Sequence, residues 1–294
     1  MTASAVLLHM LAQRLDPAAA AWLRESLACL AGGGSDRDLY RCVSLASRKL
    51  GKAPLAPDAA ARAAAAQARP GWDPSSWTVD QAARVLLLLA TGSDADRFVT
   101  RLDALCATAD VDELVAFYRG LPLYPDPLRH CARAAEGVRS NMRVVFEAVA
   151  HGNPYPAEQF ADEAWNQMVL KALFVGSTLH PIHGLDQRAN PALARMLGDY
   201  AHERWAARRS ISPELWRCVG PFVDPVVDSP ASGALLQDMA RVLDTGTAPE
   251  RAAAALALRD STAPEVQVLL NSHKTLLDAV STRGIGWATV QEFN

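Results

Sequence analysis

The histidines and carboxylates best suited to chemistry lie in one part of this 294-residue chain, between residues 151 and 216. His202 and Glu203 are neighbours there, and a carboxylate near an imidazole can tune it for acid–base catalysis. Adjacent positions on a helix point about a hundred degrees apart, so each side chain would need partners from elsewhere in the fold. General acid–base chemistry by His202 and Glu203 is therefore one candidate function of this stretch.

A metal site is a weaker candidate in the same stretch. His180, His183 and Asp186 fall within seven residues and could offer two imidazoles and a carboxylate from one loop. The spacing matches no established ligand pattern, because neither an HExxH motif nor a second histidine pair is present. Histidines that satisfy hydrogen bonds of a turn are the simpler interpretation. We expect no metal and no other cofactor.

Ligand binding is the third candidate, because polar side chains interrupt segments that are otherwise apolar and helical. A buried lysine needs an anionic partner, so Lys171 would either line a polar cleft or face solvent, and both alternatives are open. Asn190 followed by Pro191 is more simply explained as the start of a helix. The residues that we expect to line a binding site are Asn166, Lys171, Asp186, Arg188, His202 and Glu203.

An arginine further upstream could contribute to the same site. Arg139 is one helical turn before Arg143, which is one turn before Glu147, so charge bracing along a helix explains all three side chains. Alternatively, Arg139 reaches the cleft that contains Lys171, where the two cations would hold a carboxylate or a phosphate.

The composition excludes several classes of protein. With a net charge of -3 and a pI near 6.2, the chain gives no sign of the basic surface that nucleic-acid binding requires. The most apolar run, residues 85–90, is far shorter than the roughly 20 residues of a membrane span. The N-terminal residues have the pattern of a first helix without a basic leader, so we expect a cytoplasmic protein. Gly-rich phosphate loops and GxSxG elbows are also absent from the sequence.

The elements that must position these residues are predicted to be helices, because alanine and leucine recur at helical spacing without sustained alternation. Asp16 with Pro17, and Thr78 with Gln81, are typical helix starts. Further helices are expected at about 57–68, 95–107, 110–119, 128–136 and 138–150. The C-terminal third should contain helices at 229–243, 248–258 and 263–271, with a short element at 288–292.

Helices of this length joined by short turns favour stacked helical hairpins, a degenerate HEAT-like α-solenoid. An irregular helical globule is the alternative. We expect three parts that form one continuous array: N-terminal helices over 1–70, a central region over 71–222, and C-terminal HEAT-like helices over 223–294.

The central region resembles the EboA family of metabolite traffic proteins, from about residue 70 to 222. The similarity is carried by RAAEGVRSNM, VFEAVA, NPYPAEQF, AWNQMVLKALFVG, GLDQRANPALARML, DYAHERWAARR and PELWRCVG. One departure is Arg209, where the family pattern suggests glycine, and it leaves the end of the local helix open.

The resemblance implies a bacterial, cytoplasmic helical protein encoded beside a prenyltransferase-like membrane protein and several enzyme-like proteins. Such clusters are associated with moving a biosynthetic precursor out of the cytoplasm. We therefore expect a non-enzymatic binding or adaptor protein in the traffic of a secondary-metabolite precursor. Its partners would be that small metabolite, other proteins of the cluster, or both, with peripheral contact to a membrane protein. The resemblance implies no catalytic residues, and an enzyme using His202 and Glu203 is the alternative.

Overall fold

The computed structural model describes residues 1–92, 94–224 and 229–294. Within these residues the chain is all α-helical, as the periodicity predicts, and the only extended pairing is one isolated bridge between Pro54 and Thr78. None of the described helices is both long and apolar enough to cross a membrane. The predicted all-α fold class is confirmed.

The chain divides into two compact units, residues Met1–Ala161 and Asp162–Asn294. The α-helices of the first unit are α1 (Ala3–Ala12), α2 (Pro17–Ala31), α3 (Asp36–Leu50), α4 (Ala59–Ala68), α5 (Val79–Leu89), α6 (Ala95–Thr108), α7 (Val111–Arg119), α8 (Cys131–Arg139), α9 (Arg143–Ala150) and α10 (Tyr155–Gln159). Those of the second unit are α11 (Asp162–Phe174), α12 (Pro191–Ala206), α13 (Ser229–Thr245), α14 (Ala248–Leu258), α15 (Pro264–Ser272) and α16 (Lys274–Thr282). The boundaries expected at residues 70 and 222 stay a prediction about the organisation of the sequence.

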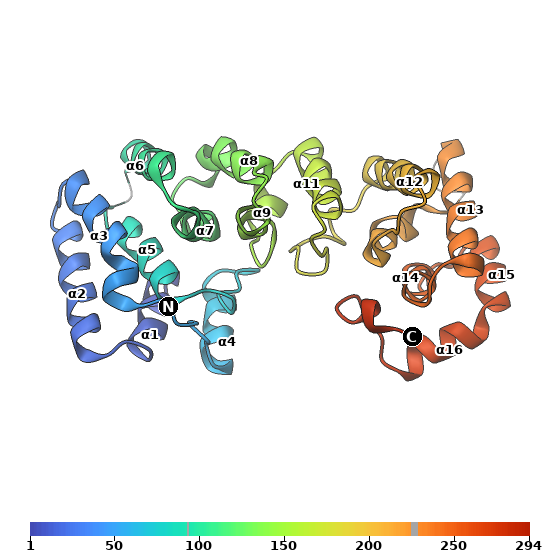
Figure 1. The fold of residues 1–294 in the computed structure, drawn as a ribbon, viewed down its shortest axis with the longest axis horizontal. Helices are drawn as coiled ribbons and strands as arrows, with labels where there is room; N and C mark the ends of the chain where they lie inside the picture. The colour runs from blue at the N-terminus through green and yellow to red at the C-terminus, as the bar shows by residue number, and fades with distance from the viewer. Residues whose placement is uncertain (93, 225–228) are drawn as a thin grey trace. The chain divides into compact units, whose positions relative to one another are not determined.

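Helices of the first unit pack as sequential pairs. α2 packs on α3, α6 on α7 and α8 on α9, while α3, α5, α7 and α9 contact one another in that order. Figure 1 shows α5, α7 and α9 in one row with α6 and α8 beside it. This packing buries apolar faces of consecutive helices against each other. A HEAT-like solenoid over the whole chain stays a prediction.

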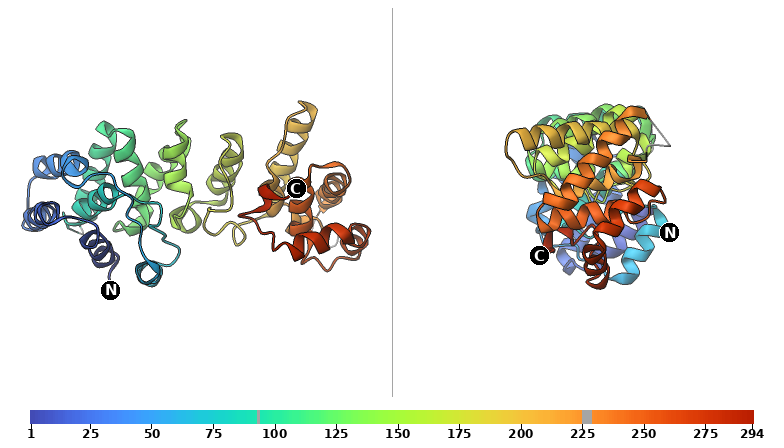
Figure 2. Two further views of the ribbon diagram at one scale, coloured as in Figure 1. Left: turned by 60° about the horizontal axis from the view of Figure 1, so that its bottom comes forward. Right: turned by 90° about the vertical axis from the view of Figure 1, so that its right-hand side faces the viewer.

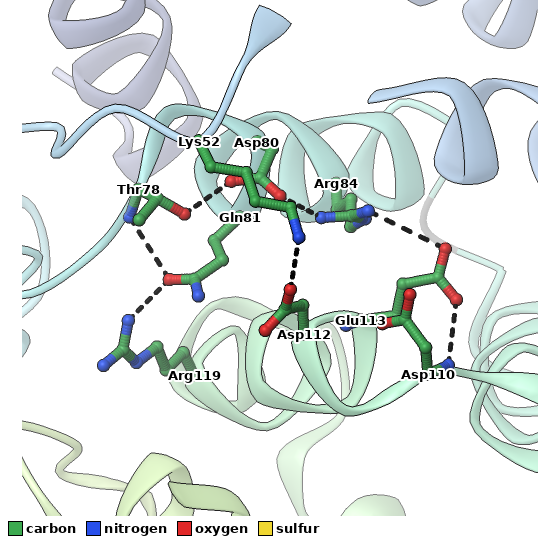
Figure 3. A network of polar contacts seen from close by, with 9 residues as sticks. All are labelled: Lys52, Thr78, Asp80, Gln81, Arg84, Asp110, Asp112, Glu113 and Arg119. Carbon is green, nitrogen blue, oxygen red and sulfur yellow. Dashed lines mark hydrogen bonds and ion pairs between the residues drawn. The ribbon is translucent and has the colours of Figure 1, made fainter. Parts of the chain in front are cut away.

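A buried ion pair helps to hold α5 against α7 in the first unit (Figure 3). Arg84 and Asp80 are each about 2% exposed and form an i, i+4 pair on α5. The other terminal nitrogen of Arg84 lies 3.8 Å from Glu113 of α7. At the start of α5, Gln81 caps the backbone of Thr78 and accepts a hydrogen bond from Arg119. Charged groups therefore fix the contact between two otherwise apolar helices.

α14 is the central helix of the second unit. Its residues Ala252–Ala255 are buried, and small side chains allow close approach of neighbouring segments. α13, α16 and the 3₁₀ helix η3 (Pro213–Cys218) all pack on it. Figure 2 shows the orange and red helices of this unit grouped together. Gly220 begins a second 3₁₀ helix, η4 (Gly220–Phe222), and a Cβ there would collide with the backbone of Ala257. Only glycine fits this contact.

The predicted helix starts at Asp16, Thr78 and Asn190 are confirmed. One C-terminal helix lies outside the predicted elements. α16 is a helix that the sequence pattern did not indicate, because it begins directly after α15 with no N-cap hydrogen bond from a side chain. The short element expected at 288–292 is a 3₁₀ helix, Val290–Glu292.

Candidate functional site

A surface cavity of about 820 Å³ lies between α11 and α12 in the second unit. We call it the α11–α12 cavity. Its volume falls within the usual range of about 300–1,000 Å³ for small-molecule sites. Its lining combines charged, polar and apolar side chains: Gln167, Leu170, Lys171, Phe174, Tyr200, Glu203, Arg204, Ala207 and Arg209.

The two walls of the cavity have the same sequence spacing. On α11 the lining residues are 167, 170, 171 and 174, and on α12 and its C-cap they are 200, 203, 204 and 207. Positions i, i+3, i+4 and i+7 form one stripe along a helix. Such a stripe is normally apolar and packs against a core, but here each stripe mixes polar and apolar residues. Each helix therefore presents one amphipathic stripe to the cavity.

Both helices end in a Schellman motif beside the cavity. On α11 the amide of Ser177 donates to the carbonyl of Ala172, and Gly176 adopts the left-handed conformation with φ 71°. On α12 the amide of Arg209 donates to the carbonyl of Arg204, and Arg208 takes the left-handed position with φ 54°. Glycine is the usual residue there. The departure at Arg209 thus lies one residue after the strained position, and α12 still ends at Ala206.

Cations outnumber anions in the cavity lining. The lining residues include three cations, Lys171, Arg204 and Arg209, and one carboxylate, that of Glu203. Arg204 donates from Nε and Nη2 to the carbonyl oxygen of Ser210, at 2.9 and 2.7 Å. These bonds fix the position of the guanidinium, and a neutral carbonyl does not cancel its charge.

The apolar part of the lining is unusually open to solvent. Phe174 is 78% exposed, although it ends a helix whose opposite side is buried in the second unit. Leu170 lies one turn before it on the same stripe and is half-buried. The apolar part of the lining is therefore an exposed phenylalanine ring beside a half-buried leucine.

A smaller cavity of about 440 Å³ adjoins the first one. Tyr200 and Arg204 belong to the lining of both cavities, so these side chains form a shared wall. Its lining includes the hydroxyls of Ser177, Thr178, Ser210 and Ser212, with Glu250 and Gln291 from the C-terminal part of the second unit. The second cavity offers mainly uncharged hydrogen-bonding groups.

Among the residues that the sequence predicts for a binding site, Lys171 and Glu203 line the α11–α12 cavity. His202, which precedes Glu203 in the sequence, has a different environment. The Nε2 atom of His202 lies 2.8 and 2.9 Å from the two carboxylate oxygens of Asp238 on α13, and its ring packs on Trp205. The carboxylate that His202 contacts is that of Asp238, whereas Glu203 lines the cavity, so the structure does not bring His202 and Glu203 together as an acid–base pair.

Asn166 and Arg188 connect α11 to the loop before α12. Asn166 is buried and exchanges two hydrogen bonds with the amide of Asn190. Arg188 binds the carboxylate of Asp162 at 2.8 Å, and its guanidinium lies 5.1 Å from the ring centre of Trp165. Both side chains make contacts that position the cavity walls.

Two of the loop residues of the metal interpretation, His180 and Asp186, have partners within the second unit. Asp186 forms a two-bond ion pair with Arg217 of η3, at 2.6 and 2.7 Å. His180 lies 3.1 Å from the buried carboxylate of Glu214, which also accepts bonds from the backbone of this turn. In the described part of the chain, no group of three His, Cys, Asp or Glu side chains could hold a metal ion. His180, His183 and Asp186 therefore form no common ligand set.

Arg139 is the last residue of α8 and belongs to the first unit. It is not among the residues that line the α11–α12 cavity. Its predicted contribution to a site with Lys171 stays a prediction.

Sequence reasoning missed Phe174, Tyr200, Arg204 and Arg209 as lining residues. The signal was present in the repeated i, i+3, i+4, i+7 spacing of the lining residues along each segment. That spacing alone does not predict an exposed Phe174, because large apolar side chains in a helix usually pack in a core.

No curated protein and no solved structure matches the chain. The model of the family described as metabolite traffic protein EboA matches residues 3–220, which include every residue lining the α11–α12 cavity. This match covers well over half of the 294 residues. The chain belongs to the EboA family of metabolite traffic proteins.

Proposed function

We propose that this protein is a non-enzymatic binding protein that holds a small metabolite during its traffic. The observation that carries the proposal is the α11–α12 cavity, which lies within the family-matched residues and has the volume of a small-molecule site. Two helices with matched amphipathic stripes form its walls. A rigid wall of this kind favours selective binding over a non-specific surface contact.

The finer features of the proposal come from the family resemblance. The metabolite would be a precursor of a secondary metabolite in a bacterial cell, and the protein would act in the cytoplasm. It would pass the precursor to other proteins of its gene cluster, including a membrane protein that it contacts at the membrane surface. In this role Lys171 and Glu203 contact the ligand, while Asn166, Asp186, Arg188 and His202 position the surrounding elements through their contacts.

Native mass spectrometry of the protein purified from its producing cells tests the proposal. The expected result is a bound small molecule that is released unchanged. Ala207→Trp fills the cavity and should remove it. Ala206→Trp is the matched control, because the adjacent Ala206 is exposed and does not line the cavity. The proposal fails if the wild-type protein carries no small molecule, or if both variants carry it equally.

The same experiment addresses the enzyme alternative. If the bound molecule is released as a chemically altered product, and His202→Ala and Glu203→Ala abolish that change while remaining folded, the protein is an enzyme. If both variants support metabolite traffic in cells that lack the native protein, the alternative is excluded.

A further inference from the structure

We infer that one ligand extends through both cavities of the second unit and places an uncharged end, rich in hydroxyl or amide groups, in the second cavity of about 440 Å³. This inference rests on the proposed function of the α11–α12 cavity as a binding site, and it adds the extent of the ligand and the chemistry of one end. Three features of the molecule support it: the contact between the two linings, the charge of the second lining, and the anchoring of its polar residues.

The linings of the two cavities meet along three segments of the chain. On α12, Tyr200 and Arg204 belong to both linings. At the end of α11, residue 174 lines the first cavity and residue 173 the second, and after α12 the same holds for residues 209 and 210. Neighbouring residues have Cα atoms only about 3.8 Å apart. The two cavities are therefore adjacent parts of one binding surface, which a single elongated ligand can cover.

The second cavity has no net side-chain charge. Its lining contains one cation, Arg204, and one carboxylate, Glu250, and its other side chains are uncharged. Both charged groups have partners within the protein. Arg204 donates to the carbonyl of Ser210, and Glu250 accepts 2.8 Å bonds from the amide and the hydroxyl of Thr247. Charge therefore favours neither an anion nor a cation here.

Two polar residues of the second cavity are held in place by buried neighbours. Ser212 lies between Ile211 and Pro213, which are both buried. Gln291 is the middle residue of the 3₁₀ helix η5 (Val290–Glu292), whose first residue is fully buried and which packs on η3 and α14. Within the described ranges, neither the Ser212 hydroxyl nor the Gln291 amide has a hydrogen-bond partner. Their backbone positions are thus set before a ligand binds, which favours affinity.

The chemistry of these side chains selects the end of the ligand. Hydroxyl and amide groups both donate and accept hydrogen bonds, so a ligand end of this kind can pair with Ser212, with Gln291 and with the phenol of Tyr200 between the cavities. An ionised end would lose water without meeting an opposite charge that is not already bonded within the protein. The rest of the ligand lies in the α11–α12 cavity.

Native mass spectrometry of proteins purified from the producing cells tests how far the ligand extends. Gln291→Trp fills the second cavity without altering a residue of the first, and it should lower the amount of bound molecule at least fivefold. Glu292→Trp is the matched control, because Glu292 is adjacent, exposed and outside both linings. It should carry as much of the molecule as the wild type. Thermal unfolding verifies that both variants are folded.

The chemistry of the end is tested with the same bound molecule. Fragmentation of the released molecule should identify hydroxyl or amide groups. Gln291→Leu keeps a side chain of similar size but removes its amide, so it should release the molecule about threefold faster or more after dilution. Glu292→Leu should release it at the wild-type rate.

The results that overturn the inference differ from those that overturn the proposed function. Full occupancy of Gln291→Trp, with Ala207→Trp empty, would confine the ligand to the α11–α12 cavity and leave the proposed function intact. Equal losses in the two tryptophan variants, an unchanged release rate in Gln291→Leu, or a molecule without hydroxyl and amide groups would also overturn the inference alone. A wild-type protein that carries no small molecule overturns the proposed function and this inference with it.

Discussion

The side-chain amides of Asn166 and Asn190 exchange two hydrogen bonds, at 3.2 and 2.8 Å, and so join α11 to the start of α12. Asn190 also caps α12, because its Oδ1 accepts a bond from the amide of Leu193 at 2.9 Å. Its Nδ2 donates a further bond to the carbonyl of Arg188. One residue therefore starts the second wall of the α11–α12 cavity and holds it against the first.

Substitution of Asn190 separates these two roles. Asn190→Ala should destabilise the second unit by about 2–4 kcal/mol, since a lost N-cap costs about 1 kcal/mol and an unpaired buried amide costs about 1–3 kcal/mol. Asn190→Ser keeps a capping oxygen and should lose only the second part. Urea denaturation measures both losses. A serine variant as stable as the wild type would show that the amide pair contributes nothing.

Arg208 is expected to be a site where glycine stabilises the protein. A non-glycine residue in the left-handed conformation costs about 1 kcal/mol, and Arg208 has φ 54°. Arg208→Gly should therefore raise the free energy of unfolding by about 1 kcal/mol. In the control, Arg195→Gly within α12 should lower it by about 1 kcal/mol, because glycine weakens a helix interior. Thermal unfolding in which both variants shift in the same direction would contradict the assigned backbone conformation.

Arg84 should be far more sensitive to substitution than an exposed lysine nearby. Arg84→Met leaves the buried carboxylate of Asp80 without its partner and should cost about 3–5 kcal/mol. Lys52→Met breaks an ion pair with Asp112 that is more than half exposed and should have little effect on stability, because exposed ion pairs are screened by solvent. The double variant Asp80→Asn with Arg84→Met should recover part of the loss. Equal destabilisation of the two methionine variants in urea would contradict this assignment.

His130 should make the first unit sensitive to acid. It is 1% exposed, and burial lowers its pKa below the usual value near 6.5, against a smaller opposite effect of its hydrogen bond to the Pro125 carbonyl. Below about pH 6.5 the His130 imidazole binds a proton in the unfolded chain but stays neutral in the folded protein until the pH reaches its lower folded pKa. The contribution of neutral His130 is therefore complete above about pH 6.5 and is lost as the pH falls through the folded pKa.

The measurement is the urea midpoint at pH 7.5 and 5.5. His130→Gln keeps a neutral donor for the Pro125 carbonyl and should reduce the loss between the two pH values. His9→Gln is the control, because His9 is exposed on α1. An unchanged loss in the His130 variant would show that other groups cause the acid sensitivity.

The sequence by itself determined the fold class, most of the helices and the family. Helix starts such as Asp16 with Pro17, and Thr78 with Gln81, are local, since the capping atoms lie within three residues of the groups that they bind. The helix at Lys274–Thr282 was not predictable in this way, because no side chain caps its start and packing on α14 and α15 stabilises it.

Only the tertiary structure decided what the polar residues of the central block do. The carboxylate that binds His202 is 36 residues away at Asp238, and the arginine that binds Asp186 is 31 residues away at Arg217. Spacing along one helix cannot specify such partners, because they depend on how separate helices pack. The cavity also depends on packing. The i, i+3, i+4, i+7 spacing of its lining residues is visible in the sequence, but the two sets of residues form one cavity only because α11 and α12 lie side by side.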